Sequence, residues 1–201
     1  GIRGSITGSY ESEKAHVRDR TKEQVEALRN SAVSLDPAVV DEIVRVAIIP
    51  IFRYSCPLVP WTATELGEIA RLWDSAYRVA WKVGRSFPAA PFRFPKEQGG
   101  MQIPDPWAVL ARECHSLITQ IMEVHDGLRD IFLAEVGHTL REQGVTTMPG
   151  LQEELYLSIT PTTPLPSLIH RMAWSFAVLG VRASWPELTA SGGADGGILS
   201  M

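Results

Sequence analysis

Residues 62–83 carry the signal that most limits what this chain can fold into. Thr62 and Glu65 form a capping box, in which a hydroxyl and a carboxylate satisfy free backbone amides at a helix start. Beyond it, apolar residues recur at helical spacing on one arc: Leu66, Ile69, Leu72, Trp73, Ala76, Tyr77 and Ala80. A helix with one apolar face needs neighbours that cover it. The segment therefore predicts an amphipathic helix to about Val83 in a helical core.

Comparable helix signals recur along the chain, and strand-like alternation is nearly absent. Asp36-Pro37 and Asp105-Pro106 each place an N-cap aspartate before a proline at the first helical position. Further helices are expected over 11–31, 128–143, 151–158 and 167–179. The sequence predicts a mainly α fold, an irregular bundle of about six to seven helices with little or no sheet.

Two of these helices carry more specific expectations. The charged segment 11–31 predicts an exposed helix with a thin apolar row, made of Val17, Val25, Leu28 and Ala32. The segment from Pro37 is rich in valine and isoleucine, so we expect its helix to be deeply buried, with Pro50 kinking or ending it.

Composition limits the class of protein. The 201 residues are 45% hydrophobic and 21% charged, which suits one globular domain, or one domain with a small appendage. Two cysteines cannot form a secreted-type disulfide framework, which favours an intracellular location, nuclear or cytoplasmic. The most apolar stretch, 43–61, is broken by arginines and prolines and predicts no membrane span. The chain begins with glycine and reads as a fragment or processed product.

Charge is unevenly distributed. The chain has a net charge of −4, yet residues 43–96 hold eight basic and three acidic side chains, a net +5 that leaves −9 for the remainder. A positive patch is where a polyanion would bind. Three of these cations, Arg71, Arg78 and Lys82, share the helix face opposite the apolar arc, and Arg85 joins them if the helix continues through Gly84.

The basic stripe also has an interpretation without nucleic acid. Glu68 with Arg71 and Asp74 with Arg78 have the spacing of intrahelical ion pairs, each worth about 0.2–0.5 kcal/mol. Such pairs would leave Lys82 and Arg85 as the less compensated charges.

Catalytic and metal-binding motifs are missing from the sequence. There is no GxSxG, no HExxH, no histidine pair four residues apart and no Asp-Asp pair. We therefore expect no catalytic residue, no metal site and no cofactor bound by this chain.

The run Phe94-Pro95-Lys96-Glu97-Gln98-Gly99-Gly100-Met101-Gln102-Ile103-Pro104-Asp105 follows the basic helix. The glycines permit a tight turn between fixed prolines, which predicts a stiff, shaped connector. Its order in the chain is also informative: it follows a buried helix ending in Ile49-Pro50-Ile51-Phe52-Arg53-Tyr54 and a proline-rich connector with Trp61.

This order resembles the region after the catalytic palm in reverse transcriptases of the non-LTR retrotransposon type. There a "P-x-x-x-Y" helix end, a basic-faced helix and an "L-P-x-x-x-G-G-L-x-I" run follow one another. The likeness covers about 43–122, and residues 1–10, with Gly4 to Gly8, resemble the end of a palm hairpin.

The resemblance implies a thumb and connection that lie along a template-primer duplex, RNA–DNA or RNA, beside the palm and fingers of a parent polymerase. Phosphate-contacting residues would be Arg71, Arg78, Lys82 and Arg85, supported by Arg93 and Lys96. Gly99 and Gly100 would shape the turn. The Tyr-x-Asp-Asp palm motif is not in this chain, so Mg²⁺ and polymerisation would belong to the missing palm.

The resemblance, the helix pattern and the glycine-rich end together give a domain plan. A thumb-like domain would span 11–126, a helical C-terminal extension 127–190 and a flexible tail 191–201. The proline-rich loop 160–166 is the best candidate for a subdomain boundary. The alternative is a helical protein-interaction module, or a degenerate retroelement remnant, that binds no nucleic acid.

Overall fold

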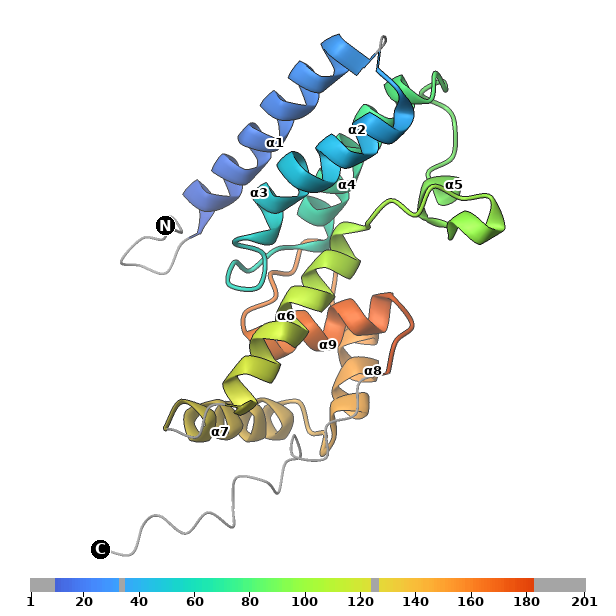
Figure 1. Ribbon diagram of the computed structural model, residues 1–201. Helices are drawn as coiled ribbons and strands as arrows, with labels where there is room; N and C mark the ends of the chain where they lie inside the picture. Colours follow the sequence, from blue (N-terminus) through green and yellow to red (C-terminus); the bar gives the residue numbers. More distant parts are fainter. Residues whose placement is uncertain (1–9, 33–34, 124–126, 183–201) are drawn as a thin grey trace, which may run out of the picture. The chain divides into compact units, whose positions relative to one another are not determined.

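The computed structural model describes residues 10–32, 35–123 and 127–182. These residues form helices and no β-strand, which confirms the mainly α fold (Figure 1). The expected hairpin end at 1–10, apart from residue 10, and the expected tail at 191–201 lie outside the described residues.

The chain divides into two compact units, Gly1–Val109 and Leu110–Met201. The first holds α1 (Glu11–Ala32), α2 (Pro37–Ile43), a π-helical turn (Val44–Ile48), α3 (Ile49–Arg53), α4 (Ala63–Ala80), α5 (Ala90–Arg93) and a 3-10 turn (Lys96–Gln98). The division falls inside α6 (Pro106–Glu123), and the second unit continues with α7 (Gly127–Glu142), α8 (Met148–Ser158) and α9 (Leu168–Val178). The sequence placed its division between 126 and 127 instead.

The first unit is built around α4, which packs against α1 and α2 (Figure 1). Its capping box is present: the Thr62 backbone N–H donates to Glu65 Oε2 at 2.8 Å, and the Glu65 N–H donates to Thr62 Oγ1 at 3.2 Å. The apolar arc of α4 is buried as expected, apart from a half-buried Leu72. An ion pair of 3.1 Å between Lys14 and Glu65 joins α1 to the start of α4.

An aromatic cluster fills the core of the first unit. The ring of Phe52 lies 5.3 Å from that of Trp61 and 5.9 Å from that of Trp73, between ring centroids. All three side chains are fully buried. Tilted and edge-on aromatic pairs of this kind add specific contacts to the burial of apolar surface. The cluster thus anchors α3, the connector after it and α4 to one another.

The apolar row on α1 is confirmed for Val17, Val25 and Leu28, which are buried. The side chain of Ala32, the fourth expected member, lies outside the described part of the structure. Glu13, Lys14 and Thr21 are buried as well, so polar side chains extend the stripe by which this helix covers the core.

Deep burial of the second expected helix is wrong. Val40, Val44 and Ile48 are buried, but Val39 and Val46 are exposed, because α2 and the π turn present one side to the core. Proline at position 50 has no backbone N–H, so the regular helical bond to residue 46 cannot form. The helix widens into the π turn and restarts as α3, with Pro50 in its first turn.

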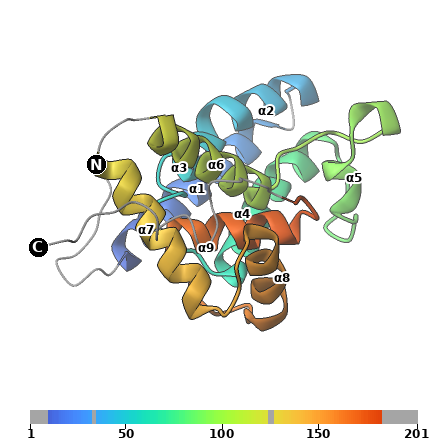
Figure 2. The ribbon, with the colours of Figure 1, turned by 90° about the horizontal axis from the view of Figure 1, so that it is seen from below.

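In the second unit, α8 packs against α9 (Figure 2). Ser167 caps α9 by accepting a hydrogen bond from the His170 N–H at 3.3 Å. The buried Arg171 donates from Nη1 to the carbonyl oxygens of Leu165 at 2.8 Å and Pro166 at 3.1 Å. These bonds tie the proline-rich loop to α9, so the loop lies inside this unit, where the sequence suggested a boundary.

Candidate nucleic-acid interface

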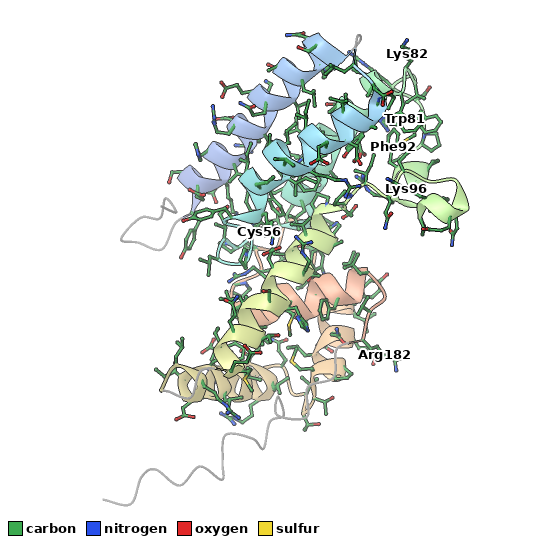
Figure 3. The ribbon with its side chains drawn as sticks, viewed as in Figure 1. Cys56, Trp81, Lys82, Phe92, Lys96 and Arg182 are labelled. Atoms are coloured by element: carbon green, nitrogen blue, oxygen red, sulfur yellow. The ribbon has the colours of Figure 1, made fainter. Side chains whose placement is uncertain are left out.

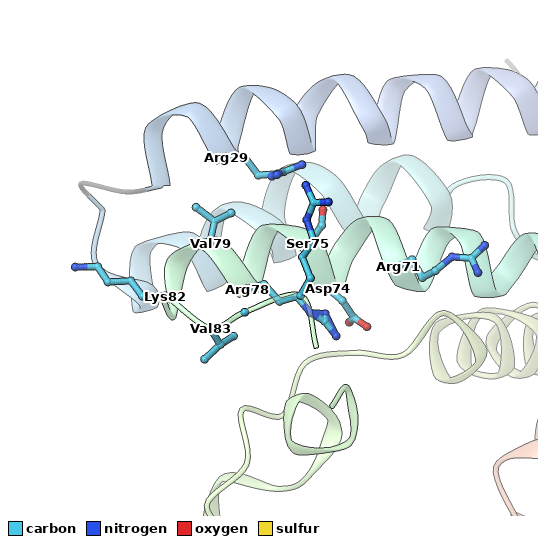
Figure 4. Close-up of a pocket in the computed structure, with 10 residues that line it drawn as sticks. Arg29, Arg71, Asp74, Ser75, Arg78, Val79, Lys82 and Val83 are labelled. Atoms are coloured by element: carbon cyan, nitrogen blue, oxygen red, sulfur yellow. The ribbon is translucent and has the colours of Figure 1, made fainter. Parts of the chain in front are cut away.

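A groove runs along α1 and α4 in the first unit. It consists of two adjoining hollows, of about 650 and 450 Å³, and Arg29, Arg71 and Ser75 line both. Figure 4 shows the larger hollow, with Arg29 on α1 and Arg71 and Ser75 on α4. We call these two hollows the basic groove.

The basic groove is positively charged. Seven basic and three acidic side chains line it, a net +4. The basic residues are Arg18, Lys22, Arg29, Arg71, Arg78, Lys82 and Arg85, and the acidic ones are Glu26, Glu68 and Asp74. A concave surface with one dominant sign of charge concentrates its field and attracts ions of the opposite sign.

Sequence reasoning missed the contribution of α1. Arg18, Lys22 and Arg29 are spaced by four and seven residues, which places them within about 40° on one helix face. That spacing can be recognised in the sequence, but acidic residues lie between these cations, so the segment was described only as a charged, exposed helix. The groove needs both helices, so the basic stripe on α4 is only half of the surface.

Neither intrahelical ion pair that the sequence suggested on α4 forms in the structure. Glu68 pairs instead with Arg18 of α1, at 3.6 Å. The carboxylate of Asp74 accepts from Arg93 Nη2 at 2.6 Å. Within the described ranges, no carboxylate lies within ion-pair distance of Lys22, Arg29, Arg71, Lys82 or Arg85. These five residues are the free cations of the basic groove.

Arg78 has a structural role within the groove. Its Nη2 donates to the carbonyl oxygen of Phe87 at 2.9 Å, and its guanidinium lies 5.3 Å from the centroid of the Phe92 ring. Both contacts hold the loop that follows α4. Arg78 therefore contributes charge to the groove while its donors are partly used by the protein.

The C-terminus of α4 places Lys82 in an unusual conformation. The helix ends at Ala80, short of the expected Val83. The Val83 N–H bonds to the Arg78 carbonyl at 3.0 Å and the Lys82 N–H to that of Val79 at 3.1 Å, the pattern of a Schellman motif. Lys82 occupies its left-handed position, with φ +53°, where glycine is the usual residue. Arg85 therefore lies in the loop after the helix, yet it still lines the groove.

The double glycine serves two separate needs. Gly99 has φ +76° and ends the 3-10 turn. Gly100 has no positive φ, but a Cβ on it would lie 2.1 Å from the carbonyl oxygen of Phe94. The segment folds back there: Gln102 N–H bonds to the Phe94 carbonyl at 2.9 Å and Ile103 N–H to that of Phe92 at 2.7 Å. The expected stiff connector is thus a closed loop.

Arg93 and Lys96, expected to support the phosphate contacts, do not line the basic groove. Arg93 lies between two carboxylates, Asp74 at 2.6 Å and Asp105 at 3.2 Å. Lys96 is exposed and lines a different hollow, at the start of α2. The six cations of the predicted site therefore lie in three places. Arg71, Arg78, Lys82 and Arg85 line the basic groove, Arg93 forms an internal bridge, and Lys96 lines a second hollow.

In the described residues, no group of three His, Cys, Asp or Glu side chains could hold a metal ion. Burial raises the pKa of the Cys114 thiol to about 12, so this sulfur stays protonated at neutral pH.

Among the residues that the structure describes, none of the helices combines the length and the apolar character that crossing a bilayer requires.

Comparisons with protein-family models, with curated proteins and with solved structures found no match to this chain.

Proposed function

We propose that this chain is a non-catalytic, thumb-like element that binds the backbone of a nucleic-acid duplex along the basic groove, as part of a reverse transcriptase. The observation that carries the proposal is the set of five free cations, Lys22, Arg29, Arg71, Lys82 and Arg85, drawn from α1, from α4 and from the residues after α4. The polymerase part of the proposal rests on the resemblance of residues 43–122.

The chemistry of the groove suits phosphates better than base edges. Four free cations and the partly engaged Arg78 line the larger hollow, and the one acidic side chain there, Asp74, is held by Arg93. Arginine presents a planar fork of donors that matches two phosphate oxygens, whereas lysine acts as a point charge. Contacts of this kind position a duplex without reading its sequence. We therefore expect binding to depend on duplex shape and charge and little on sequence.

The experiment is a titration of the purified chain against a labelled RNA–DNA duplex at two salt concentrations. Affinity should fall steeply as salt rises, because bound phosphates release counterions. It should fall further in Lys82→Glu and in Arg85→Glu, which reverse two free cations of the groove. Binding that ignores both salt and these substitutions would overturn the proposal.

A helical protein-interaction module is the second candidate. Exposed apolar side chains support it, among them Val46 (65% exposed) in the first unit and Leu157 (76% exposed) in the second. Apolar surface of this kind also suits docking against the palm of a parent polymerase. Failure of the chain to bind any duplex, at low salt and in folded form, would favour this candidate.

A further inference from the structure

A second hollow, of about 570 Å³, lies at the start of α2 and the end of α4, within the first unit. We propose that it binds one unstacked nucleobase, with Trp81 as the stacking surface. This inference rests on the proposed function for the source of the base, a single-stranded end of the duplex held in the basic groove. We call the hollow the Trp81 pocket.

Trp81 presents a partly exposed aromatic ring at the pocket. It is 45% exposed and lines the pocket from the C-cap of α4, directly after Ala80. Its backbone is fixed, because the Trp81 N–H bonds to the Tyr77 carbonyl at 2.9 Å and Trp81 lies inside the Schellman motif of residues 78–83. An exposed, well-positioned indole offers its face to any base, since every base has a π surface.

The remaining walls are mainly apolar. Pro37 and Ala38 line the pocket from α2, and Gly100 and Met101 line it from the closed loop. Figure 3 shows Trp81 and Lys96 along the same edge of the unit. A pocket with apolar walls and few polar groups is typical of sites for small flat ligands.

The polar groups of the pocket are of two kinds. Asp41 is already engaged: it accepts from Arg45 Nε at 2.9 Å and from the Tyr77 hydroxyl at 2.8 Å. Burial, together with the Asp41 carboxylate, raises the pKa of Tyr77, which keeps its hydroxyl as a donor. The negative charge of Asp41 is therefore balanced by Arg45 and only weakly repels the phosphate of a bound nucleotide.

Asp36 and Lys96 remain for the ligand. Asp36 accepts from the Ala38 N–H through Oδ1 at 2.7 Å, which leaves Oδ2 for a further donor. Within the described residues, Lys96 has no carboxylate within ion-pair distance. A carboxylate oxygen accepts from an exocyclic amino group, and an ammonium binds a phosphate. A base that carries an amino group, with its own phosphate, complements both.

Neighbouring residues of the chain connect the Trp81 pocket to the basic groove. Trp81 and Lys82 are consecutive residues, yet Trp81 lines the pocket and Lys82 lines the groove. A strand whose phosphate lies at Lys82 is therefore within one residue of the indole. Bases inside a duplex are already stacked, so only an unpaired nucleotide can use this surface.

The test uses a base whose fluorescence reports stacking. An RNA–DNA duplex carries a short single-stranded overhang with one 2-aminopurine, and a tetranucleotide with the same base is tested without the duplex. Binding to the chain should quench both probes. Trp81→Ala should abolish the quenching and weaken binding of the overhang duplex by about 10-fold, as loss of one base–aromatic stack does. Trp81→Phe should retain most of both effects.

The outcomes separate this inference from the proposed function. If quenching is absent, or if Trp81→Ala leaves it unchanged, base binding in the Trp81 pocket is overturned, whether or not a duplex without an overhang binds the chain. Quenching of the tetranucleotide that depends on Trp81 supports the base site even if a duplex without an overhang fails to bind. Failure of that duplex to bind would overturn only the proposal that the basic groove binds a duplex. Thermal denaturation of each variant confirms that loss of quenching is not loss of fold.

Discussion

Arg93 donates from Nη2 to Oδ1 of Asp74 at 2.6 Å, and this contact joins α5 to the middle of α4. The same guanidinium reaches Asp105 through Nε at 3.2 Å, just before α6. One arginine thus pairs with two carboxylates, those of Asp74 and Asp105. The bridge closes the loop that contains both the 3-10 turn and the double glycine.

Arg93→Ala should destabilise the chain by about 3 kcal/mol, because it leaves the buried Asp74 carboxylate without its partner. Urea unfolding measures this. Arg93 does not line the basic groove but holds Asp74, which does, so duplex affinity of the folded variant should fall by less than about 10-fold, a change of about 1.4 kcal/mol. Unchanged stability with clearly weaker binding would instead place Arg93 in the interface, as the sequence predicted.

The pH dependence of stability should carry the signature of Asp74. Burial raises the pKa of Asp74 above its ordinary value of 3.8, and Arg93 offsets only part of this effect. The Asp74 carboxyl therefore binds its proton more tightly in the folded chain than in the unfolded chain. The resulting stability is fully present below pH 3.8 and is lost as the pH rises through the raised pKa.

Asp74→Asn removes that titration. The difference in unfolding free energy between the original chain and Asp74→Asn should therefore decrease as the pH rises from below 3.8 toward neutrality. Urea unfolding of both proteins across this range measures the difference. A difference that grows with pH would show that the Arg93 contact outweighs burial.

Lys82→Gly should stabilise the fold while it weakens duplex binding. A left-handed residue other than glycine costs about 1 kcal/mol, and Lys82 has φ +53°. Gly144 and Gly180 hold the same position in Schellman motifs at the ends of α7 and α9, each with φ +67°. They supply matched controls: Gly144→Ala and Gly180→Ala should each lose about 1 kcal/mol. Lys82→Gly melting below the original chain would refute this account of the helix end.

The two adjacent glycines should respond differently to alanine. Gly99→Ala meets no atom within 4 Å and should cost only the strain of its positive φ, about 1 kcal/mol. Gly100→Ala places a Cβ 2.1 Å from a backbone oxygen, which cannot move without opening the loop. We expect a clearly larger loss in thermal midpoint for Gly100→Ala. Equal losses would mean that the loop relieves the close contact at Gly100, which would contradict this account.

Local sequence patterns predicted most of the helices. The capping box at Thr62 and the aspartate caps at Asp36 and Asp105 act within a few residues, so their chemistry is legible without the fold. The end of α4 could not be predicted in this way, because Lys82 occupies the left-handed position where a glycine would have indicated the helix C-terminus. The π turn before Pro50 likewise depends on how a helix adapts to a missing N–H.

The site was only half predictable, because it depends on which helices pack together. The basic stripe on α4 could be read from helical spacing, but its pairing with Arg29 of α1 is a tertiary contact. The ion-pair partners of Glu68 and Asp74 also come from distant parts of the chain, namely Arg18 and Arg93. Spacing alone favours the local partners, which the structure does not use.

The central claim is that cations on both helices bind phosphates together. The measurement is the slope of log affinity against log salt for the RNA–DNA duplex. Five free cations predict a slope of about −4, and the double variant Arg29→Glu/Arg71→Glu should reduce its magnitude by about 2. Arg20→Glu is the matched control, since Arg20 lies on α1, is about half exposed and lines neither hollow of the groove. A slope near zero, or an equal loss in Arg20→Glu and in the double variant, would contradict the account.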